Sequence, residues 1–284
     1  MIKRRDFLQL SAAGLAALAL HKYSSAAETR IPLGVQLYTV RDQAEKNLNQ
    51  VLAQISKIGY QEVELYWNVY THPAAELRRM VADNGLRAPS GHFNYDGLPG
   101  KLDYAKELGV QYVICPMLPE DMWTSADGFK KAAAQFNQWG EKVHGMGMQF
   151  GFHNHNYEFQ KFGNITGFDI LTQNTDAKLV CLEMDCYWIT QAGQDPVAML
   201  KKFGSRIQLL HLKDRKAGFP TSQSLNPTAE HFTEVGSGTI DWKTLLTVAQ
   251  QIGVKHYFVE RDSGSTPAME SIATSYQYLN KLLA

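Results

Sequence analysis

The strongest constraint on the fold is a regular alternation of short apolar runs with longer stretches of helical periodicity. The apolar runs are residues 33–38, 62–66, 86–92, 112–116, 148–153, 179–184, 207–212 and 256–260. The helical stretches are residues 47–58, 74–84, 98–108, 126–145, 168–175, 196–203, 242–252 and 268–282. Strands that alternate with helices form parallel βαβ units, and eight such units close naturally into a barrel. The alternation therefore predicts an α/β protein with a single (β/α)8 TIM barrel domain.

The main alternative is an open, doubly wound sheet that binds a dinucleotide. Such sheets carry a Gly-x-Gly-x-x-Gly turn after the first strand. The first run here reads "LGVQLY" and lacks that turn. Several helical stretches end at a glycine directly before the next run, as at Gly59 and Gly109, which is the usual helix C-terminal stop. The missing dinucleotide-binding turn and the regular glycine stops together favour the barrel over the open sheet.

The first 27 residues have the three parts of an export signal. Lys3, Arg4 and Arg5 precede an uncharged apolar run at residues 10–20, and small residues follow at positions 25–27. The apolar run is too short to span a bilayer as a mature helix. Paired arginines followed by Phe-Leu resemble a twin-arginine signal. We therefore expect residues 1–27 to be a signal peptide, residues 28–284 to be the mature barrel, and the location to be periplasmic or secreted without a stable membrane anchor.

The charge balance and the cysteine content limit the classes of molecule that the protein could bind. Residues 1–27 hold four basic side chains and one acidic side chain, so the whole-chain balance of 28 basic to 28 acidic residues becomes 24 to 27. This balance argues against a nucleic-acid surface. The three cysteines have no metal-finger spacing. We expect a small carbohydrate as the partner, and a homo-oligomer remains open.

Ionisable side chains lie at the ends of the last four apolar runs. They are His153, His155 and Glu158 in "GFHNHNYEF", Glu183 and Asp185 in "LEMDCYW", His211 and Lys213 in "HLKD", and Glu260 and Asp262 in "VERD". In a TIM barrel these strand ends meet at one mouth, where carboxylates would repel each other without a cation. We therefore expect a divalent metal (Mn²⁺, Mg²⁺, Co²⁺ or Zn²⁺) held by Glu158, Asp185, His211 and Glu260.

Further polar and aromatic side chains near strand ends are candidates for substrate contacts. They are Gln36, Tyr38, Glu64, His92, His155 and Trp188. Lys213 lies two residues past His211 on the same strand face, from which it could polarise a carbonyl. His153 could serve as a base or a metal ligand, because imidazole transfers protons near neutral pH.

Taken in order, these motifs resemble the xylose isomerase-like TIM barrels, the group of sugar phosphate isomerases and epimerases. The similarity runs through almost the whole mature chain, in the segments "LGVQLYTVRD", "GYQEVELY", "SGHF", "GFHNHNYEF", "LEMDCYW", "HLKD", "VGSGTIDW" and "VERD". The resemblance implies a metal held by Glu, Asp, His and Glu from strands five to eight. In the epimerases the strand-five glutamate lies within the strand, where this chain has His153. Either Glu158 reaches the metal, or His153 or His155 replaces it.

The resemblance implies a metal-dependent sugar isomerase or epimerase. Such enzymes use two metal-bound glutamates, here Glu158 and Glu260, to remove and return a proton beside a carbonyl through an enediolate. Export favours a non-phosphorylated sugar or keto-sugar. Imidazoles on strand five would make the site asymmetric, which suits the alternative, a lyase or hydratase acting on 3-keto-glycosides by metal-assisted β-elimination. A second alternative is a non-catalytic sugar-binding barrel.

Overall fold

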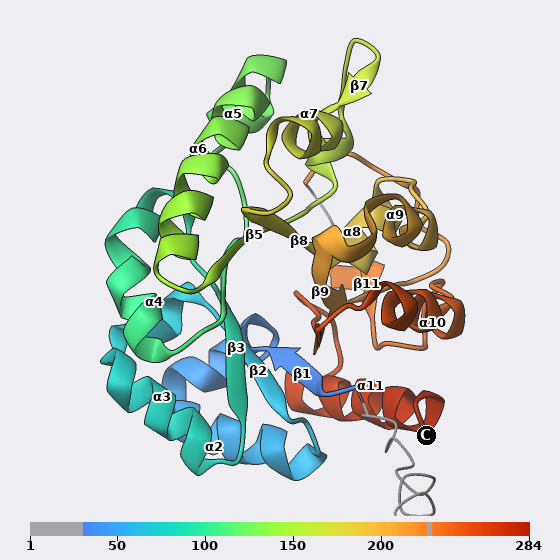
Figure 1. The fold of residues 1–284 in the computed structure, drawn as a ribbon. Coiled ribbons are helices and arrows are strands. Elements are labelled where there is room, and N and C mark those ends of the chain that lie inside the picture. Colours follow the sequence, from blue (N-terminus) through green and yellow to red (C-terminus); the bar gives the residue numbers. More distant parts are fainter. Residues whose placement is uncertain (1–30, 226–228) are drawn as a thin grey trace, which may run out of the picture. The chain divides into compact units, whose positions relative to one another are not determined.

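Eight parallel strands close into a barrel in the computed structural model, which describes residues 31–225 and 229–284 (Figure 1). The strand order around the barrel is β1-β12-β9-β8-β5-β4-β3-β2, which follows the chain once around. The strands are β1 (Leu33–Gln36), β2 (Glu62–Leu65), β3 (Arg87–His92), β4 (Tyr112–Cys115), β5 (Gln149–His153), β8 (Val180–Asp185), β9 (Ile207–Leu212) and β12 (His256–Val259). The predicted TIM barrel is confirmed. The predicted signal peptide, residues 1–27, lies outside the described residues.

Helices cover the outside of the barrel (Figure 1). They are α2 (Arg41–Ile58), α3 (Ala74–Asp83), α4 (Leu102–Leu108), α5 (Glu120–Trp123), α6 (Ala126–Gly145), α7 (Gly167–Asn174), α8 (Cys186–Gln191), α9 (Pro196–Phe203), α10 (Trp242–Ile252) and α11 (Ala268–Leu282). On β5, the outward side chains of Phe150 and Phe152 each lie 5.2 Å, between ring centroids, from Phe136 of α6. None of these helices in the described part of the chain combines the length and apolarity that a membrane span requires.

Element boundaries differ from the sequence prediction where local geometry is irregular. The first helix begins at Arg41, six residues earlier than predicted, and is kinked at Asn47, whose φ of −158° is not helical. Residues Tyr95–Lys101 form a 3-10 helix that contains Pro99, and α4 starts only at Leu102. The prediction also missed α5, α8 and two small two-stranded sheets, β6 (Lys161–Phe162) with β7 (Ile165–Thr166) and β10 (Asp214–Arg215) with β11 (Phe232–Thr233).

The barrel interior changes from apolar to polar along the strands. Tyr112, Ile114, Cys181, Leu209 and Phe258 form a buried apolar cluster contributed by four strands. The backbone of β1 lies close to the Phe258 ring, because a Cβ built on Gly34 would be 2.5 Å from that ring. Side chains two residues apart share a strand face, so Cys181, Leu209 and Phe258 are followed two residues later by the polar Glu183, His211 and Glu260. The apolar cluster therefore fills the barrel interior beneath the polar residues.

Candidate metal centre and active site

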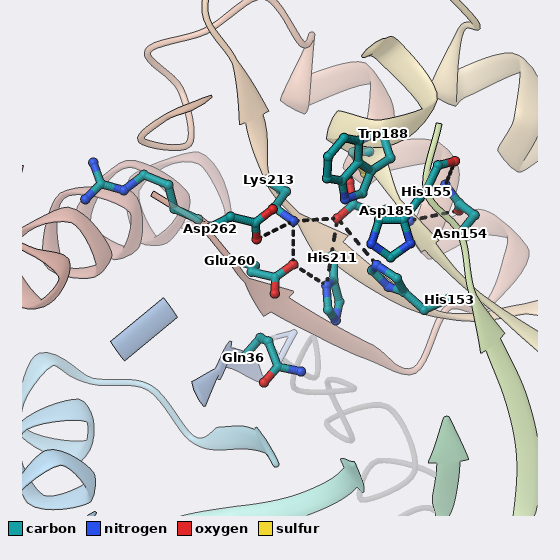
Figure 2. Close-up of polar contacts among 12 residues, drawn as sticks. Gln36, His153, Asn154, His155, Asp185, Trp188, His211, Lys213, Glu260 and Asp262 are labelled. Atoms are coloured by element: carbon teal, nitrogen blue, oxygen red, sulfur yellow. Dashed lines mark hydrogen bonds and ion pairs between the residues drawn. The ribbon is translucent and has the colours of Figure 1, made fainter. Parts of the chain in front are cut away.

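Four side chains from consecutive strands converge at the carboxyl end of the barrel (Figure 2). His153 ends β5, Asp185 ends β8, His211 lies on β9, and Glu260 directly follows β12. Each offers one ligand atom, and these atoms all lie within 4.8 Å of one another. His211 Nδ1 is 2.8 Å from Glu260 Oε2, and Asp185 Oδ2 is 3.9 Å from both His211 Nδ1 and His153 Nε2. We call these four residues the outer group.

The outer group fits a divalent metal by its donor set and by an unsatisfied oxygen. Asp185 is fully buried, and its Oδ1 accepts a hydrogen bond from the Trp188 backbone N–H at 2.8 Å. Its Oδ2 makes no hydrogen bond, although Lys213 Nζ lies 3.4 Å away. Desolvation raises the pKa of Asp185 to about 7, even with Lys213 opposing it. Two imidazole nitrogens and two carboxylate oxygens suit zinc and other divalent transition metals, so this buried group could hold one.

The two imidazoles of the outer group differ in charge. Desolvation and the nearby His211 lower the pKa of His153 to about 3, so His153 is neutral and has a free lone pair. Desolvation also lowers the pKa of His211, but Glu183, Glu260 and Glu64 raise it further, and the net pKa lies well above the usual value. The carboxylates that favour a cation therefore hold a proton on His211 in the metal-free protein.

Glu158, one of the two side chains expected to be the strand-five ligand, lies outside the outer group. Strand β5 ends at His153, and the chain then bends into the 3-10 helix Tyr157–Phe159. There Glu158 Oε2 accepts a hydrogen bond from the His155 backbone N–H at 2.9 Å, and Oε1 has no partner. Desolvation raises the pKa of Glu158 to about 8. His153 stands on the inward face of β5 and is the strand-five member of the outer group.

A second set of polar side chains lies on the other side of the two imidazoles, and its member His92 also reaches the cavity described below. Glu183 Oε2 is 2.7 Å from His92 Nε2, and Glu64 Oε2 is 2.6 Å from His211 Nε2. Gln36 Nε2 donates to Glu64 Oε2 at 2.7 Å. Desolvation raises the pKa of Glu183, but the three surrounding imidazoles lower it more, and the net pKa lies well below the usual value. We call Glu64, His92 and Glu183 the inner group.

Gln36 and Glu64 were expected to contact the substrate, and their depth corrects that expectation. Both side chains are completely buried, and neither lines the cavity above the outer group. They are engaged with each other and with His211 instead. Strand β1 ends at Gln36 and β2 ends at Leu65, two residues and one residue before the predicted ends, so both side chains belong to the strands themselves and not to the loops that follow them.

Lys213 links the outer group to Asp262 (Figure 2). Its Nζ lies 2.8 Å from Glu260 Oε2 and 2.8 Å from Asp262 Oδ1, and 5.3 Å from the centroid of the Trp188 ring. Desolvation lowers its pKa, but Asp185, Asp262 and Glu260 raise it more, so the net pKa lies well above the usual value. Lys213 is therefore a buried ammonium held by carboxylates.

A cavity of about 600 Å³ opens above the outer group. Of the predicted substrate contacts, Tyr38, His92, His155 and Trp188 line it, and so do the predicted catalytic residues His153, Lys213 and Glu260. One wall is apolar, formed by residues 116–119 after β4, and the rim carries Tyr38 and Trp67 with ring centroids 5.5 Å apart. The cavity therefore has polar side chains at its base and apolar side chains along one wall.

The sequence prediction did not assign roles to Glu183, Ser90 or Asp262. Glu183 lies two residues before Asp185 and shares its face of β8, and Asp262 lies two residues after Glu260 in the segment that follows β12. This spacing of two residues was the available signal for both. For Ser90, which donates to Glu64 Oε1 at 2.6 Å, the sequence offers no comparable signal.

Comparisons with known proteins agree with the fold and indicate an enzyme. An inosose dehydratase from Geobacillus thermodenitrificans is 27% identical to this chain, in an alignment that covers 84% of this chain and 90% of the relative. A solved sugar phosphate isomerase/epimerase from Parabacteroides distasonis superposes with a TM-score of 0.74 at 25% identity, over 90% of this chain and 95% of that one. An IOLI protein solved with a zinc atom has the same fold, with a TM-score of 0.68 at 17% identity over 89% and 98% of the two chains. The family model described as xylose isomerase-like TIM barrel matches residues 52–282, and the chain belongs to that family.

Proposed function

We propose that this enzyme is a metal-dependent lyase that removes water or an alcohol from a keto-sugar by β-elimination. One observation carries the proposal: on the strand-five side the outer group contains His153 and not Glu158. An epimerase of the resembling kind needs a carboxylate on each face of its substrate, whereas this site has an imidazole on one of them. The similarity to a relative named inosose dehydratase supports the same reaction class, because a dehydratase removes water.

The outer group would hold the metal through His153, Asp185, His211 and Glu260. When bound, a divalent cation would polarise the substrate carbonyl and acidify the carbon–hydrogen bond beside it. The protein's own contribution is to fix these four side chains by burial, with His153 and Glu260 lining the cavity.

The elimination needs one group that accepts a proton and one that donates a proton. His155 lines the cavity and its Nδ1 has no hydrogen-bond partner, and desolvation together with His153 lowers its pKa well below the usual value, so the ring is neutral and keeps a free lone pair. Lys213 also lines the cavity and carries a proton. In the proposed step, the carbon proton passes to His155 and its electron pair forms the new C=C bond. The C–O bond to the leaving group breaks, and Lys213 protonates the leaving oxygen.

The cavity favours a substrate that is not phosphorylated and that is larger than one sugar ring. Among the described lining residues Lys213 is the one lysine or arginine, and it is already paired with Glu260 and Asp262, so no basic side chain is free for a phosphate. The volume of about 600 Å³ and the apolar wall at residues 116–119 suit the second group of a glycoside. We therefore assign 3-keto-glycosides as the preferred substrate class and keto-cyclitols as the smaller alternative.

The test is incubation of the metal-loaded enzyme in deuterated water with a 3-keto-glucoside, an inosose and a free ketose. Mass spectrometry should detect loss of water or release of the aglycone. Deuterium uptake without bond loss would instead identify an epimerase and refute the proposal. The variant His153→Glu restores a carboxylate on strand five, so we expect it to increase deuterium exchange relative to elimination. His153→Gln is the matched neutral control.

A further inference from the structure

The imidazoles of the metal centre stand between two layers of carboxylates. On the inner side, Glu183 Oε2 lies 3.3 Å from His153 Nδ1 and 3.4 Å from His211 Nε2, and Glu64 Oε2 lies 2.6 Å from His211 Nε2. On the outer side, His153 Nε2 faces Asp185 and His211 Nδ1 faces Glu260. Each ring therefore turns one nitrogen to the inner group and the other to the proposed metal position.

We propose that Glu183 and Glu64 are positioning residues that fix the tautomers of His153 and His211. An ionised carboxylate only accepts hydrogen bonds, so the ring nitrogen that faces it must carry the proton. A neutral imidazole has one such proton, which leaves the opposite nitrogen with a lone pair. In the zinc-loaded protein, where both rings are neutral, the inner carboxylates would thus aim the lone pairs of His153 Nε2 and His211 Nδ1 at the outer group.

The carboxylate of Glu64 itself accepts hydrogen bonds from two neighbouring side chains. Gln36 Nε2 donates to its Oε2 at 2.7 Å, and Ser90 Oγ donates to its Oε1 at 2.6 Å. These donors come from β1 and β3, on either side of the strand that carries Glu64. With one such bond at each oxygen, the carboxylate has a fixed orientation in which Oε2 also faces His211 Nε2. This explains why Gln36 and Glu64 lie below the mouth.

The inner group is better explained by hydrogen bonding than by a second metal ion. The potential ligand atoms of His92, His153, Glu183 and His211 also lie within 4.8 Å of one another. However, Glu183 Oε2 is 2.7 to 3.4 Å from a nitrogen of each of the three rings. The carboxylate oxygen thus occupies the position on which the nitrogens converge. It is hydrogen-bonded to His92 Nε2 at 2.7 Å, and the His153 and His211 rings lie in contact with it.

The chain offers a matched control at the opposite end of the same strand. Glu62 lies two residues before Glu64 on β2, is 1% exposed, and its Oε2 is 2.8 Å from His256 Nδ1. It is also a buried carboxylate that contacts an imidazole, but its partners are His256 and Arg87 rather than the outer group. Glu62→Gln should therefore report the cost of neutralising a buried carboxylate without touching the metal centre.

The experiment measures zinc affinity by calorimetry and ring protonation by nitrogen-15 NMR in histidine-labelled, zinc-loaded protein. In the unmodified enzyme, we expect His153 to carry its proton on Nδ1 and His211 to carry its proton on Nε2. In Glu183→Gln, the amide can present either its oxygen or its NH₂ to the ring. We expect mixed tautomers of His153 and a zinc affinity lower by about 10- to 100-fold. Glu64→Gln should do the same to His211, and Glu62→Gln should change neither measurement.

The inference is independent of the reaction, so it can fail while the proposed function stands. Zinc affinity in Glu183→Gln and Glu64→Gln equal to that of Glu62→Gln would overturn it. Protonation of His153 Nε2 or His211 Nδ1 in the zinc-loaded, unmodified enzyme would also overturn it. If Glu183→Gln does not fold, Glu64→Gln decides the question, because its effect on His211 alone is sufficient.

Discussion

Glu158→Gln should stabilise the protein at alkaline pH and have little effect in acid. Glu158 is fully buried, accepts one hydrogen bond from the His155 backbone N–H, and has one oxygen without a partner. Desolvation raises its pKa from the ordinary 4.5 to about 8. The glutamine amide keeps an oxygen for the His155 N–H but cannot ionise, so the variant removes only the cost of charge burial.

The magnitude follows from the two pKa values. Below pH 4.5 the carboxyl is protonated in both the folded and the unfolded chain, and it contributes no pH dependence. Between pH 4.5 and 8 the unfolded chain releases the proton while the folded chain retains it, so the free energy of unfolding falls as pH rises. At about 1.4 kcal/mol for each pH unit in this interval, the full penalty above pH 8 is roughly 5 kcal/mol.

The assay is urea unfolding followed by tryptophan fluorescence, with EDTA present to remove any contribution from bound metal. Trp123 stacks on Tyr157 with ring centroids 4.6 Å apart, so it reports on the segment that carries Glu158. The stability difference between the variant and the unmodified protein should grow from near zero at about pH 4 to several kcal/mol at about pH 9. Glu141→Gln, on the exposed face of α6, is the control. A difference that does not change with pH would refute the reasoning.

Three other predictions concern the metal, the proton donor and export. Asp185→Asn should lower zinc affinity by at least about tenfold in calorimetry, whereas Glu158→Gln should leave it unchanged, because Glu158 lies outside the outer group. Lys213→Met should reduce the elimination rate by about 10² to 10⁴ while keeping zinc bound, and an unchanged rate would remove Lys213 from the mechanism. Replacement of Arg4 and Arg5 by lysines should keep the protein in the cytoplasmic fraction, and undiminished export would argue against a twin-arginine signal.

The barrel could be predicted from the sequence because two of its signals are local: apolar runs that alternate with helical stretches, and glycines at the ends of helices. The helices at residues 196–203, 242–252 and 268–282 have the predicted bounds, and the polar strand ends converge as expected. The bounds were less accurate where Asn47 kinks a helix and where Pro99 lies in a 3-10 helix. Those are departures from regular geometry that periodicity does not encode.

The position of Glu158 depends on contacts that are remote in sequence. Asn154 Oδ1 accepts a hydrogen bond from the Asp185 backbone N–H at 3.1 Å, which ties the start of the turn to β8. Asn156 Nδ2 donates to the backbone oxygens of Ser222 and Ser224, at 2.8 and 2.9 Å. These contacts span 31, 66 and 68 residues, so the sequence of the turn alone could not indicate that Glu158 points away from the metal centre.

The alternation of inward side chains in β8 restricts how this protein can vary in length. Cys181, Glu183 and Asp185 share the face that points to the barrel axis. The intervening Leu182 and Met184 face the helical layer, near Phe168 of α7 and Met199 and Phe203 of α9. Loss of one residue within this strand would turn both carboxylates toward the helices and two apolar side chains into the site. Homologues should therefore differ in β8 by substitution, and insertions and deletions should be confined to the loops.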